Sequence, residues 1–292
     1  MENGPTPTLS YLVCATPRSG STLLCHLLDQ TGIAGHPAEY FEALRHSGVP
    51  RRPHEYFDPD RHSNIVERLA FREMPSGAAE PNPLWHPETY DQYLDWAIAE
   101  GTTPNGVFGA KLMWGYLRDF AQLLRGIEGM AGLTVPELLA RSFPGLRYIQ
   151  VTREDKVRQA VSLWKAVQTQ TWSRDAAESE PQTEPVFSFR AINYLVRLLT
   201  AHDASWDAYF LGLGYDPLKV TYEELAEAPE PVVRRVLGHL GIAAPSDLAI
   251  AAPRLKIQAD AVSERWVQRV HEHLQALEVD ETYRNAGSVT NR

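Results

Sequence analysis

A strand, a polar loop and a helix follow one another near the start of the chain, and this order constrains the fold more than any other feature. Residues 10–15 (SYLVCA) form a nearly continuous apolar run, which is typical of a strand buried on both faces of a parallel sheet. Residues 16–22 (TPRSGST) are small and polar, and residues 22–32 carry leucines at helical spacing before Gly32. The sequence therefore predicts a strand–loop–helix unit of the α/β class.

Further strand and helix patterns alternate along the 292 residues, which predicts a central parallel sheet with helices on both faces. No linker separates two parts, so we expect one domain over residues 1–292. We expect loose ends at about 1–8 and 285–292, an irregular segment at 45–63 and a surface loop at 173–185. The predicted strands are 10–15, 32–41, 106–114, 146–154 and 218–225, and the predicted helices are 22–32, 87–102, 114–126, 134–142, 155–170, 188–211, 229–241 and 263–277.

The charge and the cysteine count exclude several classes of protein. Lys and Arg total 28 and Asp and Glu total 37, a net charge of −9, which argues against nucleic-acid binding through bulk charge. An anionic ligand therefore needs a local site. Cys14 and Cys25 make no disulfide framework, and His46, His54 and His62 do not have zinc-site spacing, so we expect no metal. Without a signal peptide or a transmembrane segment, we expect a cytoplasmic protein.

The loop 16–22 predicts a site for a phosphate or sulfate group. A helix N-terminus offers unpaired backbone N–H groups and the positive end of the helix dipole. Gly20 allows close approach of an anion, and Arg18 adds charge-assisted donors. The alternative is a plain N-capped turn, because Ser and Thr favour that position as well. The hydroxyl donors are Ser19, Ser21 and Thr22.

This loop departs from the nucleotide-binding pattern G-x-x-x-x-G-K-[ST]. It lacks the first glycine, and Ser21 stands where the lysine is expected. That lysine and its Ser or Thr neighbour normally serve the γ-phosphate and Mg²⁺. Their absence disfavours a kinase and favours an anionic donor that needs no metal.

A second candidate phosphate site follows the strand at 146–154. Arg153 lies at its carboxyl end, where ligands of α/β proteins bind, and Ser162 follows nine residues later in the next helix. An arginine and a hydroxyl there would hold a second phosphate. The alternative is a surface arginine paired with Glu154 or Asp155.

These motifs resemble the sulfotransferases that use 3′-phosphoadenylyl sulfate (PAPS). The segment TPRSGSTLL resembles their 5′-phosphosulfate loop, Arg153 and Ser162 resemble their 3′-phosphate motif, and VTYEEL (220–225) resembles their Y-E-D-L strand. Animal cytosolic relatives carry lysine in the first loop, so Arg18 would take over part of its role. The chain is most similar to the bacterial trehalose 2-sulfotransferases, in the stretches LVCATPRSGSTLLCHLL, HPAEYF, FGAKLMWG and TREDKVRQAVSLW.

The resemblance implies a single sulfotransferase domain with a P-loop-like (sulfotransferase and nucleotide-kinase-like) architecture. It implies PAPS as donor and trehalose as acceptor, with PAP and trehalose 2-sulfate as products. It also implies a homodimer and a place in sulfolipid biosynthesis.

The transfer to a sugar hydroxyl needs a base that accepts the proton. The resemblance assigns this role to Glu39, which lies near the end of residues 32–41, where the predicted short strand runs into a loop. The alternative interpretation is that Glu39 has no catalytic role and is an exposed loop residue or the partner of a neighbouring cation. His36 is the competing base, because its ordinary pKa suits the task better, and Glu42 is a further candidate.

Lys111 lies in an otherwise apolar strand, where a lysine without a partner is costly to bury. We expect Lys111, together with Arg18, to stabilise charge on the bridging oxygen of the donor. The alternative is a surface lysine at the end of the strand.

The sequence pattern identifies the residues that would bind the acceptor and the rest of the nucleotide less sharply than those of the two phosphate sites. Lys256 and Arg265, near the last helix, are expected at the 3′-phosphate or the adenine, with solvated surface charge as the alternative. The expected acceptor-binding residues are Glu39, Tyr40, Arg51, His54 and Glu55.

Three other functions stay open. The same chemistry would serve another sugar or a glycolipid, and a P-loop nucleotide or sugar kinase is disfavoured only by the missing Gly and Lys. A non-catalytic nucleotide-binding protein would keep the loop but would not need Glu39.

Overall fold

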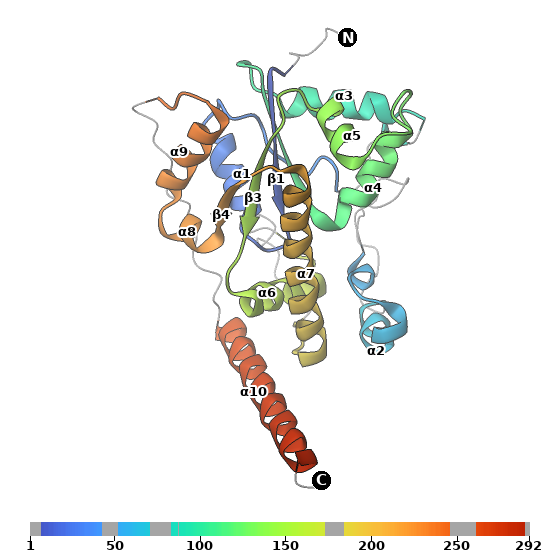
Figure 1. Ribbon diagram of the computed structural model, residues 1–292, viewed down its shortest axis with the longest axis vertical. Helices are drawn as coiled ribbons and strands as arrows, with labels where there is room; N and C mark the ends of the chain where they lie inside the picture. Colours follow the sequence, from blue (N-terminus) through green and yellow to red (C-terminus); the bar gives the residue numbers. More distant parts are fainter. Residues whose placement is uncertain are drawn as a thin grey trace. The chain divides into compact units, whose positions relative to one another are not determined.

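The computed structural model describes residues 7–42, 52–70, 83–86, 88–172, 184–245 and 261–289. The chain divides into two compact units (Figure 1). The first comprises Met1–Glu154 and Ala201–Leu255, and the second comprises Asp155–Thr200 and Lys256–Arg292. One domain over residues 1–292 stays a prediction.

A four-stranded parallel sheet forms the centre of the first unit, in the order β2-β1-β3-β4. The first strand thus has a neighbour on each side, with the second strand on one side and the third on the other. The connection from the first strand to the second and that from the second to the third therefore run in opposite directions across the sheet. Ligands of open α/β sheets bind at such a reversal, outside the carboxyl ends of the strands. The strands are β1 (Leu9–Ala15), β2 (Val107–Met113), β3 (Arg147–Thr152) and β4 (Leu218–Thr221).

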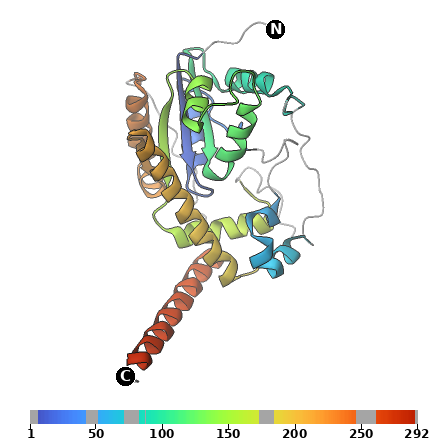
Figure 2. The same ribbon diagram turned by 45° about the vertical axis from the view of Figure 1, so that its right-hand side comes forward.

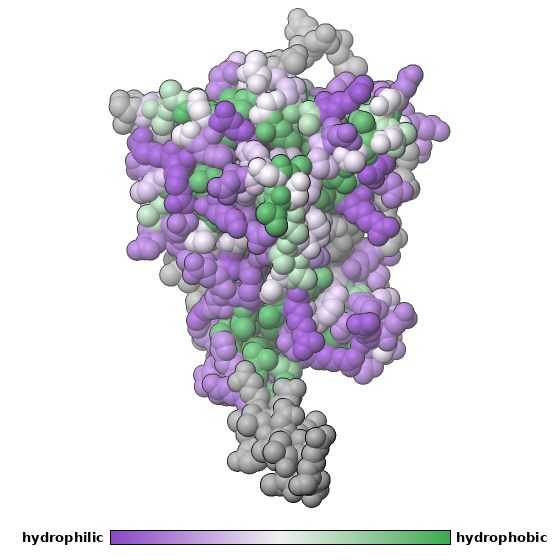
Figure 3. All heavy atoms as spheres, in the orientation of Figure 1, coloured by the Kyte–Doolittle hydropathy of each residue, from purple (hydrophilic) through white to green (hydrophobic). Residues whose placement is uncertain are grey.

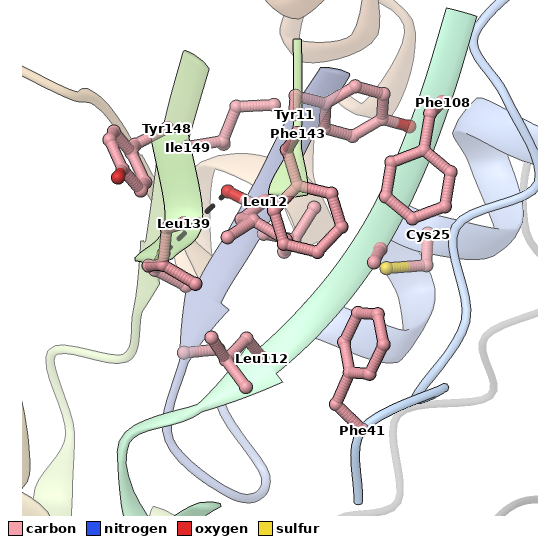
Figure 4. Close-up of a cluster of buried hydrophobic side chains, with 14 of the residues drawn as sticks. Tyr11, Leu12, Cys25, Phe41, Phe108, Leu112, Leu139, Phe143, Tyr148 and Ile149 are labelled. Atoms are coloured by element: carbon pink, nitrogen blue, oxygen red, sulfur yellow. Dashed lines mark hydrogen bonds between the residues drawn. The ribbon is translucent and has the colours of Figure 1, made fainter. Parts of the chain in front are cut away.

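The apolar run at the start of the chain forms the buried centre of this sheet. From Tyr11 to Ala15 every residue of β1 is fully buried, as expected for a strand covered on both faces. The Tyr11 hydroxyl donates to the Ala34 carbonyl at 2.6 Å, which satisfies its polar group in the core. Figure 4 shows the surrounding cluster, in which the rings of Phe108 and Phe143 stack with centroids 5.4 Å apart.

Helices cover both faces of the sheet (Figures 1 and 2). α1 lies on one face, where it packs against α9, and α4 and α5 lie on the other. α7 continues into the first unit at residue 201 and reaches the end of β1, since Trp206 donates to the Ala15 carbonyl at 3.1 Å. The helices are α1 (Ser21–Asp29), η1 (Pro53–Tyr56), α2 (Pro59–Ala70), α3 (Tyr90–Gly101), α4 (Trp114–Arg125), α5 (Val135–Ser142), α6 (Lys156–Thr169), α7 (Phe189–Leu213), α8 (Tyr222–Glu227), α9 (Pro229–Leu240) and α10 (Ala261–Val289).

Residues 32–41 were predicted to form a short strand that runs into a loop, and the strand part of this prediction is wrong. This segment makes one isolated parallel bridge, between Ala38 and Ala110, in which Lys111 N donates to the Ala38 carbonyl at 2.9 Å. Pro37 has no N–H to donate to a ladder. Gly35 has a φ of +71°, and a Cβ there would lie 2.7 Å from Gly109 N. The segment therefore lies against β2 without becoming a strand.

Two other boundaries differ from the sequence prediction. The strand predicted over 218–225 ends at Thr221, because Thr221 and Glu224 form a capping box that starts α8. The segment predicted as irregular over 45–63 contains η1 and the beginning of α2. Both of these helices begin with a proline, which favours the first helical position.

The second unit is helical among its described residues. α6 and α10 are joined by the bidentate pair of Arg158 with Glu264 and by a hydrogen bond of 3.0 Å from Lys165 Nζ to Ser263 Oγ. α10 extends to Val289, beyond the predicted helix 263–277 and into the end predicted to be loose. The segment has no proline to stop it.

Hydrophilic residues cover most of the face shown in Figure 3. Among the described residues, no helix is long and apolar enough to cross a membrane. Cys14 and Cys25 are free and buried. The predicted surface loop 173–185 lies outside the described residues, except for 184 and 185.

Candidate active site

The loop between β1 and α1 turns through two left-handed residues. Arg18 has a φ of +64° and Gly20 a φ of +89°. Ser19 N donates to the Thr16 carbonyl at 3.3 Å, and α1 begins at Ser21. Left-handed residues in a tight turn aim successive N–H groups into one concavity, and an anion binds in such a nest.

Two side chains of α7 hold the beginning of this loop. Thr16 Oγ1 donates to Asp203 Oδ1 at 3.0 Å, and Trp206 Nε1 donates to the Ala15 carbonyl at 3.1 Å. Both contacts are made where β1 ends. They fix the point at which the backbone leaves the sheet.

Ser19 provides an observation that fits an anion. Its side chain is fully buried, and its Oγ has no hydrogen-bond partner among the described residues. A buried polar atom without a partner costs about 1–3 kcal/mol. A phosphate or sulfate oxygen in the nest would satisfy this hydroxyl.

Tyr222, which the sequence analysis did not single out, connects the loop to Arg153. A Cβ on Gly20 would lie 2.8 Å from Tyr222 Cδ2, so the ring packs directly on the loop backbone. The Arg153 guanidinium lies over the same ring, 4.3 Å from its centroid. The sequence signal that could have pointed to Tyr222 was its position at the start of the Y-E-E-L segment.

The two arginines of the predicted anion sites lie close enough to interact. Burial lowers the pKa of Arg18, Arg153 lowers it further, and Tyr222 opposes the shift. Buried like charges are costly without a counter-ion. A ligand that carries two anionic groups would offset that cost.

Lys111 joins the sheet to the start of α1. Its Nζ lies 2.6 Å from Glu39 Oε1 and donates to Thr22 Oγ1 at 2.7 Å. The lysine side chain is 7% exposed and that of Glu39 is 22% exposed. Lys111 therefore has a partner that compensates its burial, and it contacts both Glu39 and the last residue of the loop 16–22.

The electrostatics around Glu39 involve a second carboxyl group. Burial alone would raise the pKa of Glu39, but Lys111 and a hydrogen bond from Glu42 lower it below its ordinary value. Burial and the charge of Glu39 raise the pKa of Glu42 to about 8. Glu39 therefore loses its proton at a lower pH than Glu42 does.

The competing base, His36, lies at the other end of α1. Its Nδ1 is 2.6 Å from Asp29 Oδ1, and both side chains are about half exposed. α1 begins beside the phosphate loop and has nine residues, a length of about 13 Å. The geometry therefore favours Glu39 over His36.

Tyr40 takes part in an aromatic cluster. Its hydroxyl donates to the His36 carbonyl at 2.8 Å, and its ring packs against Trp96 and Phe108. Burial raises the pKa of Tyr40 to about 12. A role for Tyr40 in acceptor binding stays a prediction.

The remaining predicted residues are not brought to this cluster by the described contacts. Glu55 accepts from Arg52 N at 2.7 Å and caps η1, which also contains His54. Ser162 in α6 and Arg265 in α10 belong to the second unit, and their roles stay predictions. Arg51 and Lys256 lie outside the described residues.

No metal site is visible in the described part of the chain, where no group of three or more His, Cys, Asp or Glu residues has a suitable arrangement. Three cations, Arg18, Arg153 and Lys111, belong to the loop or interact with its residues. They suit an anion.

The parallel sheet and the loop at its point of reversal define a P-loop-like α/β protein whose loop lacks the usual lysine. Residues 10–273 match the family model of the Stf0 sulphotransferases, and the chain belongs to that family. The resemblance noted in the sequence is confirmed.

Two relatives are 34% identical to this chain. The trehalose 2-sulfotransferase of Mycobacterium tuberculosis aligns over 274 residues, 89% of this chain and 93% of that protein. The trehalose 2-sulfotransferase of Mycolicibacterium smegmatis aligns over 273 residues, 92% of this chain and 96% of that protein. The solved sulfotransferase STF9 of Mycobacterium avium is 14% identical, with a TM-score of 0.43 over 92% of this chain and 69% of that one.

Proposed function

We propose that the protein transfers a sulfuryl group from PAPS to the 2-hydroxyl of trehalose. The acceptor oxygen attacks sulfur in line with the leaving oxygen, so that an S–O bond forms to the sugar and the S–O bond to the 5′-phosphate breaks. The hydroxyl proton passes to Glu39. The products are trehalose 2-sulfate and PAP.

The geometry of the loop supports the donor half of this proposal. Residues Arg18 to Thr22 would hold the 5′-phosphosulfate through backbone N–H groups and the unpartnered hydroxyl of Ser19. Arg153, packed on Tyr222, would hold the 3′-phosphate. The resemblance adds Ser162, Lys256 and Arg265 to the nucleotide.

The cluster around Lys111 supports the transfer itself. As sulfur leaves the donor, negative charge develops on the bridging oxygen, and a lysine ammonium beside the loop stabilises it. Glu39 gains a proton in the same step and ceases to be a charged partner of Lys111. The ammonium of Lys111 can then stabilise the negative charge on the leaving oxygen.

The acceptor is proposed from the two relatives, both of which bear the name trehalose 2-sulfotransferase. Tyr40, Arg51, His54 and Glu55 are the proposed donors and acceptors for sugar hydroxyls. We also propose, from the resemblance alone, a homodimer that acts in the cytoplasm and supplies sulfolipid biosynthesis.

The single observation that carries the function is the contact of Glu39 with Lys111 and of Lys111 with Thr22. These contacts bring a carboxylate and an ammonium group to the loop 16–22, which supports the roles proposed for them. The test is sulfate transfer from PAPS to trehalose by wild type, by Glu39→Gln and by the control Glu88→Gln, an exposed glutamate. We expect Glu39→Gln to lower kcat about 10²–10⁴-fold and the control to match wild type.

The possible outcomes separate the remaining functions. Turnover of ATP but not of PAPS would overturn the proposal in favour of a kinase. Binding of PAP without any turnover, across a panel of sugars and glycolipids, would favour a nucleotide-binding protein. Turnover with another sugar alone would keep the transfer chemistry and replace the acceptor, and full activity of Glu39→Gln would remove only the base.

A further inference from the structure

The ammonium of Lys111 is held by two side chains that differ in charge. Its Nζ lies 2.6 Å from Glu39 Oε1 and donates to Thr22 Oγ1 at 2.7 Å. An ammonium carries three N–H donors, so these two contacts, within the part of the chain that the structure describes, leave one donor for a ligand. Glu39 attracts the ammonium through its charge, whereas Thr22 accepts a hydrogen bond as a neutral group.

The contact with Thr22 brings the ammonium to the loop 16–22. Lys111 lies in β2, and its side chain is 7% exposed. Thr22 is the second residue of α1 and is exposed. The buried ammonium therefore meets a hydroxyl that lies at the surface, where the loop passes into the helix.

This contact supplies a cation at a position where the loop has none of its own. In the pattern G-x-x-x-x-G-K-[ST] a lysine follows the second glycine, and here Ser21 follows Gly20. Thr22 occupies the last position of the pattern, and its hydroxyl holds a lysine that comes from the neighbouring strand instead.

We propose that Thr22 is a positioning residue, whose hydroxyl holds the ammonium of Lys111 at the loop while Glu39 takes up the acceptor proton. This inference rests on the proposed function. Once Glu39 is protonated, the attraction between two full charges is lost. The hydroxyl of Thr22 stays neutral throughout and none of its bonds breaks, so its contact with Lys111 persists as negative charge develops on the leaving oxygen.

The first test measures kcat and KM for PAPS in wild type, Thr22→Val and Thr22→Ser. Both variants keep the backbone N–H that would contact the donor, but only serine keeps the hydroxyl. We expect Thr22→Val to lower kcat by about 10–10²-fold with a nearly unchanged KM for PAPS, and Thr22→Ser to retain most of kcat. The control is Thr200→Val, which removes an exposed hydroxyl bonded within α7. Wild-type kcat in Thr22→Val would overturn the inference.

A double-mutant cycle shows whether Thr22 acts through Lys111. The ammonium is gone in Lys111→Met, so the addition of Thr22→Val to this variant should cause no further loss of kcat. A further loss as large as that in the wild-type background would overturn the inference, because the hydroxyl would then act on the donor directly.

A third test measures binding and does not depend on turnover or on the folding of Lys111→Met. The 5′-phosphate of PAP carries the negative charge that the leaving oxygen gains, so Thr22→Val should raise the Kd of PAP about tenfold. Adenosine 3′-phosphate lacks that group and should bind wild type and Thr22→Val equally. Titration calorimetry measures both ligands, and an equal Kd of PAP in the two proteins would overturn the inference.

The tests separate this inference from the proposed function. If wild type sulfates trehalose while Thr22→Val keeps its kcat and its affinity for PAP, the function stands and the inference fails. If the affinity for PAP depends on Thr22 as expected while wild type sulfates no acceptor, the hold of Thr22 on Lys111 stands for phosphate binding and the proposed function fails.

Discussion

The Nζ of Lys111 lies 2.6 Å from Oε1 of Glu39, and the two side chains are 7% and 22% exposed. The net contribution of such a buried ion pair to the free energy of folding can be close to zero, because desolvation offsets the attraction of the two charges. Removal of one partner, however, leaves the other charge buried without compensation, which is strongly destabilising. The pair therefore links the stability of the protein to the protonation of the proposed base.

The substitution Lys111→Met tests this link. We expect the free energy of unfolding at pH 7 to fall by about 2–4 kcal/mol and sulfate transfer to fall about 10²-fold or more. Without the lysine the folded-state pKa of Glu39 rises above its unfolded value, so the variant gains relative stability as the pH falls below that raised pKa. Denaturant unfolding at pH 5 and pH 7 measures the effect. The double variant Lys111→Met with Glu39→Gln should be more stable than Lys111→Met alone. If the double variant instead loses the sum of the two single losses in free energy of unfolding, Lys111 and Glu39 are not coupled.

The backbone of the phosphate loop leaves no room for a side chain at Gly20. A Cβ there would lie 2.8 Å from Tyr222 Cδ2, with φ at +89°. We expect Gly20→Ala to cost about 1–3 kcal/mol and to weaken PAP binding. Gly32→Ala is the matched control, because Gly32 has a φ of +65° and nothing within 4 Å of its Cβ. Equal losses of PAP affinity in the two variants would show that the contact with Tyr222 is unimportant.

The hydrogen bond from Thr16 to Asp203 is expected to hold the start of the loop. Thr16 is fully buried, and valine has nearly its shape without the hydroxyl. We expect Thr16→Val to lower the free energy of unfolding by about 1.5–3 kcal/mol, measured by denaturant unfolding. Thr200→Val removes an exposed hydroxyl that donates to the Val196 carbonyl, and it should change stability by less than about 0.5 kcal/mol. An unchanged free energy of unfolding in Thr16→Val would mean that other contacts position the loop.

Arg153 is expected to contribute to ligand binding more than to folding. Burial and Arg153 both lower the pKa of Arg18, so Arg153→Ala removes an unfavourable neighbour together with the stacking on Tyr222. PAP at 100 times its Kd should stabilise wild type by about 2.7 kcal/mol and the variant by far less. The measurement is thermal unfolding with and without PAP, and the control is Arg235→Ala, whose arginine pairs with Glu224 on the surface. Equal PAP-induced shifts in wild type and Arg153→Ala would remove Arg153 from the site.

Local signals in the sequence predicted the elements that local physics forms. The apolar run of β1, the polar loop after it and the proline-to-glycine punctuation of α9 were recognised because each depends on neighbouring residues. The same holds for β3 and for the helices that follow β2. These elements also carry Arg18 and Arg153, so the positions of these two arginines at the ends of β1 and β3 followed from the sequence, while their roles in binding an anion stay predictions.

The contacts between distant residues were not predictable in the same way. Glu39 and Lys111 are 72 positions apart in the sequence, and no periodicity links a loop carboxylate to a strand lysine. The approach of Tyr222 to Gly20 depends on the missing Cβ of the glycine and on where β4 ends.

Synthesis of the chain separates the phosphate loop from the residues that hold it. Thr16 emerges early, but Asp203 and Trp206 follow 187 and 191 positions after their partners. At 5–20 residues per second the interval is roughly 10–40 s. During that time β1 lacks the helix that fixes its end, and its apolar residues also wait for β3. A nascent chain of this protein therefore leaves the apolar residues of β1 without their full set of neighbours until β3 has been made, about half-way along the sequence.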